Sequence, residues 1–319
     1  MKIYIITGLC VLSNLNGMEE EQPGGITRKP AFHSLNEIQP QLTLQNFSKI
    51  KREPREWDAQ VYDESCKTQT EAFLEFLSSN KINIHNKTVL DIGCGTGKIA
   101  EKLAKQATHV HAFDASENMI NLAKKQYDHL SNISFEHCFA EDFTSSTKYQ
   151  LAIASHSINW FEDKKEAFKR INNILEENGE FFANIQTKEN PIPLNLKVAQ
   201  EKIKTINPLY KRVAEYNFIT GSPYPSNIEL RNILTETGFE ILKYEEQSLW
   251  SVMTKDEIIV KEQPLMFDKP IMQYVPNVII KSFFDDYITQ YLSQLIEANE
   301  GQYLEETTTT IVHARKIKK

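Results

Sequence analysis

The chain has 319 residues, of which 40% are hydrophobic and 25% charged, and its net charge is −7. These values fit a soluble globular protein with one large domain, or with a core and a subdomain. They give no electrostatic case for a nucleic-acid partner, because nucleic acid favours a basic face.

The first 17 residues resemble a secretory signal peptide, since Lys2 is followed by a ten-residue apolar run from Ile3 to Leu12. That run is too short to span a bilayer, so no stable membrane anchor is expected. Its cleavage region is poor, because of the two positions −3 and −1 before Met18 that should be small, only −1 is, as Gly17. An export signal, a misplaced start with Met18 as the first residue, and an ordered N-terminal segment all stay open.

Residues 18–51 are polar and contain scattered proline and glycine without sustained periodicity. This composition predicts a flexible arm. The main folded domain is expected over residues 52–319, because helix and strand patterns begin in this range.

One stretch, Thr88 to Ala104, organises that domain. A short apolar run ending at Ile92 leads into the turn Gly93-Cys94-Gly95-Thr96-Gly97, and a helical pattern follows. Glycines let the backbone approach a ligand closely, and a helix N-terminus offers unpaired N–H groups. The spacing differs from the dinucleotide pattern G-x-G-x-x-G. Asp91 before the turn would repel a pyrophosphate and would suit a ligand that carries an ammonium group.

A second acidic residue, Asp114, ends the next apolar strand, which is the usual place for a contact with ribose hydroxyls. With these residues the sequence resembles the class I S-adenosylmethionine-dependent methyltransferases, whose first motif is nearly reproduced from Val89 to Gly97. S-adenosylmethionine carries an ammonium, a sulfonium and a ribose, so the resemblance implies this cofactor.

The resemblance also implies which residues bind the cofactor. Asp91 would orient the ammonium, Asp114 would take the ribose hydroxyls, and three glycines of the turn would line the methionine and the ribose. The cofactor candidates are Asp91, Gly93, Cys94, Gly95, Gly97, Asp114, Ala115, Met119, Ala140, Glu141, Ser155, Tyr62 and Gln69. Tyr62 could instead be a packed tyrosine, Gln69 a solvated glutamine and Met119 a core residue. Phe139 stands where many relatives have an acid for the adenine, so the adenine would rest on Phe139, or Glu141 or Asp142 would supply the polar contact.

Strands and helices alternate after the first motif, which is typical of a parallel sheet with helical crossovers. The expected strands are Val89–Ile92, Val110–Phe113, Ile133–Phe135, Gln150–Ala154, Glu180–Ile185, Phe239–Tyr244 and Thr307–Ala314. The resemblance places the last strand antiparallel, in the order 3-2-1-4-5-7-6. The expected fold class is therefore α/β, a doubly wound seven-strand sheet with helical lid insertions.

The segment after the fourth strand is expected to face the methyl group, because ligands bind beyond the carboxyl ends of parallel strands. It resembles the corresponding segment of trans-aconitate, juvenile-hormone-acid and malonyl-carrier methyltransferases, with Asn159 where several relatives have a histidine. Trp160 would wall the substrate pocket or anchor the core. His156 is the best titratable group there, and a structural role stays open. His156 and Trp160 are the catalytic candidates.

Two insertions, at about 187–225 and 249–303, are expected to form a lid over the strand ends, the second largely helical. Long insertions at the active face usually carry function. Their aromatic and apolar composition suits a small organic substrate, and Arg212 or Arg231 would hold a carboxylate. His109 and His111 lack a third ligand at useful spacing, so no metal is predicted.

The sequence therefore predicts an enzyme that methylates a small molecule, with O-methylation of a carboxylic acid favoured. A hydroxyl or amine acceptor, a non-catalytic cofactor-binding module or secreted effector, and a nicotinamide oxidoreductase are the alternatives. The four cysteines form neither a disulfide framework nor a C-x-x-C motif. A cytoplasmic location is favoured, with secretion as the alternative if residues 1–17 act as a signal peptide.

Overall fold

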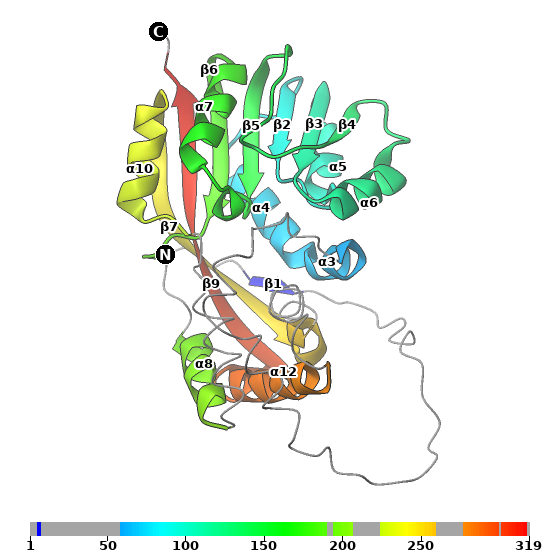
Figure 1. Ribbon diagram of the computed structural model, residues 1–319, viewed down its shortest axis with the longest axis vertical. Coiled ribbons are helices and arrows are strands. Elements are labelled where there is room, and N and C mark those ends of the chain that lie inside the picture. The colour runs from blue at the N-terminus through cyan, green and yellow to red at the C-terminus, as the bar shows by residue number, and fades with distance from the viewer. Residues whose placement is uncertain are drawn as a thin grey trace, which may run out of the picture.

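The computed structural model describes residues 5–7, 58–189, 194–206, 224–259, 277–299 and 301–317. Its centre is one sheet in the order β1-β7-β9-β6-β5-β2-β3-β4, with β8 paired to β9 (Figure 1). The strands are β1 (Ile5–Thr7), β2 (Thr88–Ile92), β3 (His109–Asp114), β4 (Ile133–His137), β5 (Tyr149–Ser155), β6 (Leu175–Ile185), β7 (Phe239–Thr254), β8 (Ile296–Asn299) and β9 (Gln302–Lys316).

The predicted seven-strand order is confirmed. From β4 to β7 the observed order corresponds to 3-2-1-4-5-7-6. The pairs among β2 to β6 are parallel, whereas β9 runs antiparallel to both β6 and β7. Because all the strands from β2 to β6 point the same way, their carboxyl ends meet at one edge of the sheet, where ligands bind in open α/β sheets.

Alternation along β2 explains why the chain winds on both faces of the sheet. Val89 packs into a core with α4, α5 and α6, whereas Leu90 and Ile92 pack into a second core with α7 and α10. Successive side chains of a strand point to opposite faces. The helices are α3 (Ala59–Ser65), α4 (Lys67–Ser79), α5 (Lys98–Ala104), α6 (Glu117–Tyr127), α7 (Lys164–Ile174), α8 (Leu194–Ile206), α10 (Asn227–Glu236) and α12 (Asn277–Leu292).

Two helices begin with side-chain caps. The side chain of Ser116 accepts the N–H of Met119 at the start of α6. Ser226 and Glu229 form a reciprocal capping box at the start of α10, which satisfies two backbone donors that a helix N-terminus otherwise leaves unpaired.

A long two-stranded ribbon, formed by β7 and β9, leaves the sheet and reaches a group of helices (Figure 1). It pairs Trp250 with Glu306 and Thr254 with Gln302. At its far end lie α8 and α12, which pack against each other. The sequence analysis assigned residues 249–303 to a largely helical insertion. The described part of that range begins and ends with strand instead, because the ladder between distant segments supplies backbone hydrogen bonds that no local period reveals.

The N-terminal segment enters the sheet at its edge. β1 pairs in parallel with β7, with Ile5 opposite Trp250 and Thr7 opposite Val252. The predicted arm at 18–51 lies outside the described residues. Within the described part of the chain, no helix is long and apolar enough to cross a membrane.

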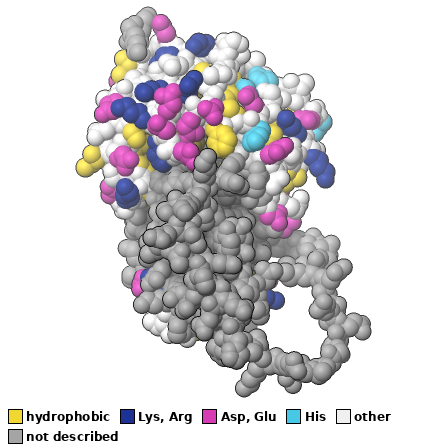
Figure 2. Space-filling view, in the orientation of Figure 1, with side chains coloured by type: hydrophobic (Ala, Val, Ile, Leu, Met, Phe, Trp, Pro, Cys, Tyr) yellow, Lys and Arg dark blue, Asp and Glu magenta, His cyan; other side chains and the backbone are white. Residues whose placement is uncertain are grey.

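The surface of the sheet half is mixed in charge. Figure 2 shows acidic and basic side chains interspersed on the visible face of its described residues. A mixed face of this kind lacks the continuous basic stripe that tracks a nucleic-acid backbone.

Candidate active site

The glycine turn between β2 and α5 is shaped by close packing inside the protein. Gly93 and Gly97 both have positive φ, 68° and 83°. A Cβ on Gly93 would lie 2.3 Å from the Cβ of Ser157, and one on Gly97 would lie 2.8 Å from Cε1 of Phe135. Any larger residue at either position would therefore push β4 or the segment after β5 away from the turn.

Asp91 is buried under this turn, with 1% of its surface exposed. The backbone N–H of Ala100 hydrogen-bonds to its carboxyl group. Its Oδ2 has no hydrogen-bond partner among the described residues. Burial, with a smaller contribution from the nearby Asp114 carboxylate, raises the pKa of Asp91 to about 7. A buried carboxyl with an unpaired oxygen favours the approach of a cation or another donor.

Asp114, at the end of β3, holds the turn from the other side. Its Oδ2 accepts the N–H of Gly95 at 2.9 Å, and its Oδ1 accepts the N–H of Ser116 at 2.9 Å. Both bonds are charge-assisted and therefore stronger than bonds between neutral groups. Asp114 thus fixes the position of Gly95 as well as the start of α6.

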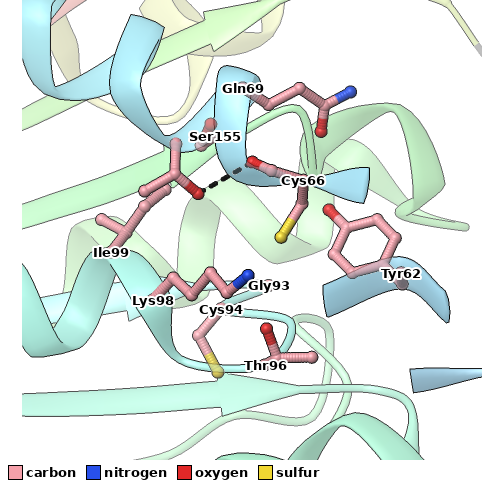
Figure 3. A pocket seen from close by; sticks show the side chains of 10 residues that line it. Tyr62, Cys66, Gln69, Gly93, Cys94, Thr96, Lys98, Ile99 and Ser155 are labelled. Carbon is pink, nitrogen blue, oxygen red and sulfur yellow. Dashed lines mark hydrogen bonds between the residues drawn. The ribbon is translucent and has the colours of Figure 1, made fainter. Parts of the chain in front are cut away.

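A narrow cleft of about 30 Å³ opens beside the turn (Figure 3). Its lining comes from the two N-terminal helices, from the glycine turn with the first residues of α5, and from the end of β5. The residues are Tyr62, Cys66, Gln69, Thr70, Gly93, Cys94, Thr96, Lys98, Ile99 and Ser155. The structure therefore brings together five of the predicted residues, Tyr62, Gln69, Gly93, Cys94 and Ser155.

The other lining residues were missed by the sequence analysis, although a signal for them exists. Cys66, Gln69 and Thr70 follow Tyr62 at four, seven and eight residues along the chain, which is the spacing of one helix face. In Figure 3 the side chains of Tyr62, Cys66 and Gln69 lie opposite those of Cys94, Thr96 and Lys98. Thr96 and Lys98 could have been found from their place within and after the glycine turn.

Thr96 adds a second buried polar atom beside the turn. It is 2% exposed, and its Oγ1 has no partner at hydrogen-bond distance among the residues that the structure describes, while a weak contact with the Cys66 thiol lowers the pKa of that thiol. Burying a hydroxyl without a partner costs about 1–3 kcal/mol. Thr96 lines the cleft and Asp91 lies under the same turn, so together they offer an acceptor for an ammonium and a hydroxyl for a carboxylate. This donor set fits the methionine end of S-adenosylmethionine.

An ion pair fastens α3 over the cleft. Lys98 Nζ lies 3.2 Å from Asp63 Oδ2 and also donates to the backbone carbonyl of Asp63. Gln126 on α6 donates to the same Oδ2 at 3.4 Å. Burial, reinforced by Cys66 and Asp114, raises the pKa of Tyr62 above its ordinary value, so its phenol stays neutral. The helix that carries Tyr62 is thereby tied to both α5 and α6.

The two cysteines at the cleft are protonated thiols. Burial, strengthened by the charges of Asp91 and Asp114, raises the pKa of Cys94 well above its ordinary value. Burial likewise raises the pKa of Cys66, against a lowering effect from Lys98. Since the thiolate is the nucleophilic form, neither side chain is activated for attack.

The segment after β5 holds a histidine in an uncommon backbone conformation. His156 has a φ of 52°, a left-handed value that costs most L-residues about 1–2 kcal/mol. Its N–H donates to the carbonyl of Asn184 at 3.1 Å, and the amide Nδ2 of Asn184 lies 2.8 Å from its Nε2. Ser157 next to it donates to the carbonyl of Ile92 at 2.7 Å, which brings this segment against the glycine turn.

Trp160 is not a core anchor. It ends the short 3₁₀ helix Ile158–Trp160 and keeps 50% of its surface exposed. Of the two roles that the sequence leaves open, burial in the core is therefore wrong, and a wall at the strand-end edge stays a prediction. Asn159 beside it is 4% exposed, and its Oδ1 has no hydrogen-bond partner within the described ranges.

The residues predicted near the adenine lie around β3, β4 and α6, outside the lining of the cleft. Met119 and Ala140 are buried in the core, and the carbonyl of Ala115 accepts from His137 Nε2 at 3.0 Å. Glu141 Oε1 accepts the N–H of Asp163 at 3.1 Å. One oxygen of Glu141 thus serves the N-terminus of α7, and the adenine contact stays a prediction.

Arg231, one of the two residues expected to hold a carboxylate, lies elsewhere. Its guanidinium stacks over the ring of Tyr244 on β7, 3.8 Å from the centroid. The preference of an arginine for an aromatic face explains this placement. Arg212 lies outside the described residues.

The histidines of β3 take part in side-chain hydrogen bonds. His109 Nε2 pairs with Ser134 Oγ at 3.0 Å. His111 bridges the hydroxyl of Tyr149, at 2.6 Å, and Glu136 Oε2, at 3.0 Å. Burial lowers the pKa of His111 against the raising effect of Glu136. In the described part of the chain, no group of three or more histidine, cysteine or acidic residues could hold a metal ion.

Comparisons with known proteins agree with this geometry. A family model described as a methyltransferase domain matches residues 60–244. Over 207 residues the chain is 23% identical to malonyl-[acyl-carrier protein] O-methyltransferase 1 of Ilyobacter polytropus, covering 63% of this chain and 71% of that protein. Over 129 residues it is 28% identical to the provisionally named methyltransferase 235L of Invertebrate iridescent virus 6, covering 40% of this chain. This match covers 47% of the viral protein, so the chain spans about half of that relative's length.

The fold agrees as well. A crystal structure of a provisionally named methyltransferase from Bacillus halodurans C-125 superposes with a TM-score of 0.52 at 15% identity, over 77% of this chain and 100% of that one. The family model covers more than half of the chain, and the sheet has the strand order of the class. The chain belongs to the class I S-adenosylmethionine-dependent methyltransferases.

Proposed function

We propose that the protein transfers the methyl group of S-adenosylmethionine to the carboxylate of a small organic acid. The choice of cofactor is supported by two buried polar atoms at the glycine turn. Asp91 Oδ2 and Thr96 Oγ1 lack hydrogen-bond partners among the described residues. Asp91 would receive the ammonium, and Thr96 would donate to the carboxylate of the methionine end. The sulfonium of the bound cofactor supplies an activated methyl group.

The protein's own part in the transfer is alignment. An in-line displacement needs nucleophile, methyl and sulfur on one axis, and positioning of that kind contributes several kcal/mol, up to about 7–11 kcal/mol in well-oriented systems. Ser155 at the end of β5 lines the cofactor cleft, and His156 and Trp160 follow it directly. We therefore place the acceptor against the segment 155–160, with the exposed face of Trp160 as one wall.

The choice of a carboxylate is supported by chemistry and by one relative. A carboxylate is already an anion at neutral pH and needs no general base, whereas a hydroxyl or an amine usually has to lose a proton. His156 is held by the amide of Asn184, and an amide does not strengthen a catalytic base as an acidic side chain does. The Ilyobacter polytropus relative is named for O-methylation of a malonyl group on its carrier.

Calorimetry tests the cofactor. Titration with S-adenosylhomocysteine is expected to show micromolar binding and titration with NAD none, since Asp91 would repel a pyrophosphate. Binding of NAD alone would refute the proposal. A screen of acids, alcohols and amines with labelled cofactor then tests the acceptor. Binding of S-adenosylhomocysteine without any labelled product would favour a non-catalytic module.

A substitution of His156 separates carboxylate from hydroxyl or amine acceptors. For a carboxylate, His156→Ala is expected to lower the rate less than tenfold, an effect under about 1.4 kcal/mol. A loss near a thousandfold that raised pH restores would show that the histidine removes a proton, and would support the hydroxyl or amine alternative. His109→Ala serves as the control, because His109 bonds to Ser134 on β4.

We also propose a cytoplasmic location. Among the described residues, Cys66, Cys94 and Cys138 are free thiols, which a reducing compartment preserves. Fractionation of cells that express the full chain tests this. Recovery of a shortened protein in the medium would instead support a cleaved signal within residues 1–17.

A further inference from the structure

We propose that Asn184 is a positioning residue that sets the tautomer and the orientation of His156. The two residues lie at the carboxyl ends of neighbouring strands, because Ser155 on β5 pairs with Asn184 on β6. Their backbones meet through the N–H of His156 and the carbonyl of Asn184, 3.1 Å apart. Their side chains meet as well, with Asn184 Nδ2 at 2.8 Å from His156 Nε2.

The position of the imidazole proton depends on which atom of the amide faces the ring. The amide nitrogen of Asn184 faces Nε2, and its Oδ1 has no hydrogen-bond partner among the described residues. Because an amide nitrogen only donates hydrogen bonds, Nε2 then accepts, and the proton of the neutral ring resides on Nδ1. Asn184 is fully buried, with 0% exposure, so water does not compete for its amide. The ring cannot turn without losing this bond.

The backbone of His156 supports the same conclusion. A left-handed residue costs free energy, and strain of this kind persists only where surrounding contacts over-determine the conformation. The two hydrogen bonds to Asn184 fix the backbone conformation of His156. The neighbouring hydrogen bond from Ser157 Oγ to the carbonyl of Ile92, at 2.7 Å, fixes the segment on its other side. These contacts therefore fix the orientation of the His156 side chain.

The consequence deepens the proposed function, on which this step depends. Nδ1–H is a neutral donor that can hold one oxygen of a carboxylate acceptor while the other oxygen attacks the methyl group. Such a donor would do what the sequence suggested for Arg212 or Arg231, of which Arg231 is stacked on Tyr244 and Arg212 lies outside the described residues. It also disfavours use of Nε2 as a base, because its lone pair is already engaged.

The tautomer can be read without turnover, which separates this inference from the proposed function. In protein labelled with ¹⁵N-histidine, long-range proton–nitrogen correlation is expected to show His156 protonated at Nδ1. Its signals are assigned by their loss in His156→Gln. In Asn184→Asp the new carboxylate accepts from Nε2–H, so the proton is expected to move to Nε2. A wild-type ring protonated at Nε2 would overturn the inference, whatever the enzyme methylates.

Kinetics supplies a second test, which does not depend on the size of the histidine's effect. If Asn184 acts through His156, Asn184→Ala and His156→Ala lower the methyl-transfer rate by the same factor within about twofold. The double variant then loses no more than either single variant. Additive losses would show that Asn184 acts independently and would overturn the inference.

Asn172→Ala is the matched control for folding. Asn172 is also a buried asparagine, 6% exposed, whose Nδ2 donates one hydrogen bond, to the carbonyl of Gly238 at 3.0 Å. It is expected to lower the thermal midpoint as Asn184→Ala does while leaving the tautomer of His156 and the rate unchanged. A changed tautomer in Asn172→Ala would mean that general loosening, and not the Asn184 contact, controls the ring.

Discussion

The glycine-turn edge of the sheet and the ribbon of β7 and β9 are stabilised in different ways. At the glycine turn, Asp91 Oδ2 is buried without a hydrogen-bond partner among the described residues. At the far end of the ribbon, by contrast, the hydroxyl of Tyr291 on α12 donates to the buried Glu305 on β9.

The difference indicates where stability is given up for binding. An unpaired buried carboxyl lowers stability until a ligand pairs with it, whereas a satisfied buried pair adds rigidity. The first region therefore behaves as a site and the second as a support. The predictions below test this division, beginning with the largest expected effect.

Replacing Asp91 with asparagine is expected to weaken binding of S-adenosylhomocysteine about a hundredfold or more, because a desolvated charge pair is worth about 2–5 kcal/mol. The same change is expected to stabilise the cofactor-free protein at pH 8. In the folded chain the pKa of Asp91 is raised from 3.8 to about 7. The unfolded chain therefore binds fewer protons between these values, and stability falls as pH rises from about 4 to 7.

Chemical unfolding across this pH range measures the effect, which reaches about 4 kcal/mol above pH 7 as an upper estimate. The comparison near pH 4 serves as the control, because the wild-type protein and Asp91→Asn should be equally stable there. Parallel stability curves for the two proteins at all pH values would show that the pKa of Asp91 is not raised in the folded protein.

Replacing Asp114 with alanine is expected to weaken binding of S-adenosylhomocysteine by about 1–3 kcal/mol, through lost charge-assisted hydrogen bonds. The structure adds that Asp114 also holds the N–H groups of Gly95 and Ser116. A 2′-deoxy analogue separates the two causes. If Asp114 contacts the ribose, the analogue binds less well than the parent to the wild-type protein but equally to the variant. Asp256→Ala, an exposed acid at the end of the ribbon, is the control.

In the ribbon region, Tyr291→Phe should lower the free energy of unfolding by about 1–3 kcal/mol, because the buried Glu305 loses a donor. Affinity for S-adenosylhomocysteine should change less than twofold. Tyr303→Phe on β9, which is less buried than Tyr291, is the control for loss of a tyrosine hydroxyl. If affinity fell in proportion to stability, the ribbon and the site would form one energetic unit, and the comparison above would fail.

The smallest expected effect concerns the ion pair between Lys98 and Asp63, 3.2 Å apart. The pair ties α3, which carries Tyr62, to α5 beside the cleft, so its loss should let α3 move away from a bound ligand more easily. Lys98→Met removes a partly exposed pair worth up to about 1 kcal/mol and should speed dissociation of S-adenosylhomocysteine about threefold to fivefold in stopped-flow. Lys102→Met, on the solvent side of α5, should leave that rate unchanged.

The cofactor half of the fold could be predicted because its signals are local. The motif from Val89 to Gly97 and the acid at Asp114 stand in short segments whose strand or helix period is visible in the sequence. Their alternation implied the parallel sheet, and the family resemblance supplied the antiparallel last strand, which the structure confirms. Tyr62 and Gln69, which the resemblance singled out, line the cleft.

The remaining features depend on contacts that no local pattern encodes. Whether Trp160 is exposed is determined by what packs around it, and Arg231 is occupied because Tyr244 lies beneath its guanidinium. The extension of β7 and β9 depends on a ladder between segments more than fifty residues apart, such as Trp250 with Glu306.

The sequence by itself thus determined the class of the fold, the cofactor and the turn that would bind it, because glycine, acid and strand lie within a few residues of one another. Only the tertiary structure brought Asn184 against His156, 28 residues away in the chain, and left Asp91 Oδ2 and Thr96 Oγ1 buried without hydrogen-bond partners among the described residues. Pairing of parallel strands brings together residues that the sequence separates by a whole crossover, so such neighbours emerge only when the sheet has formed.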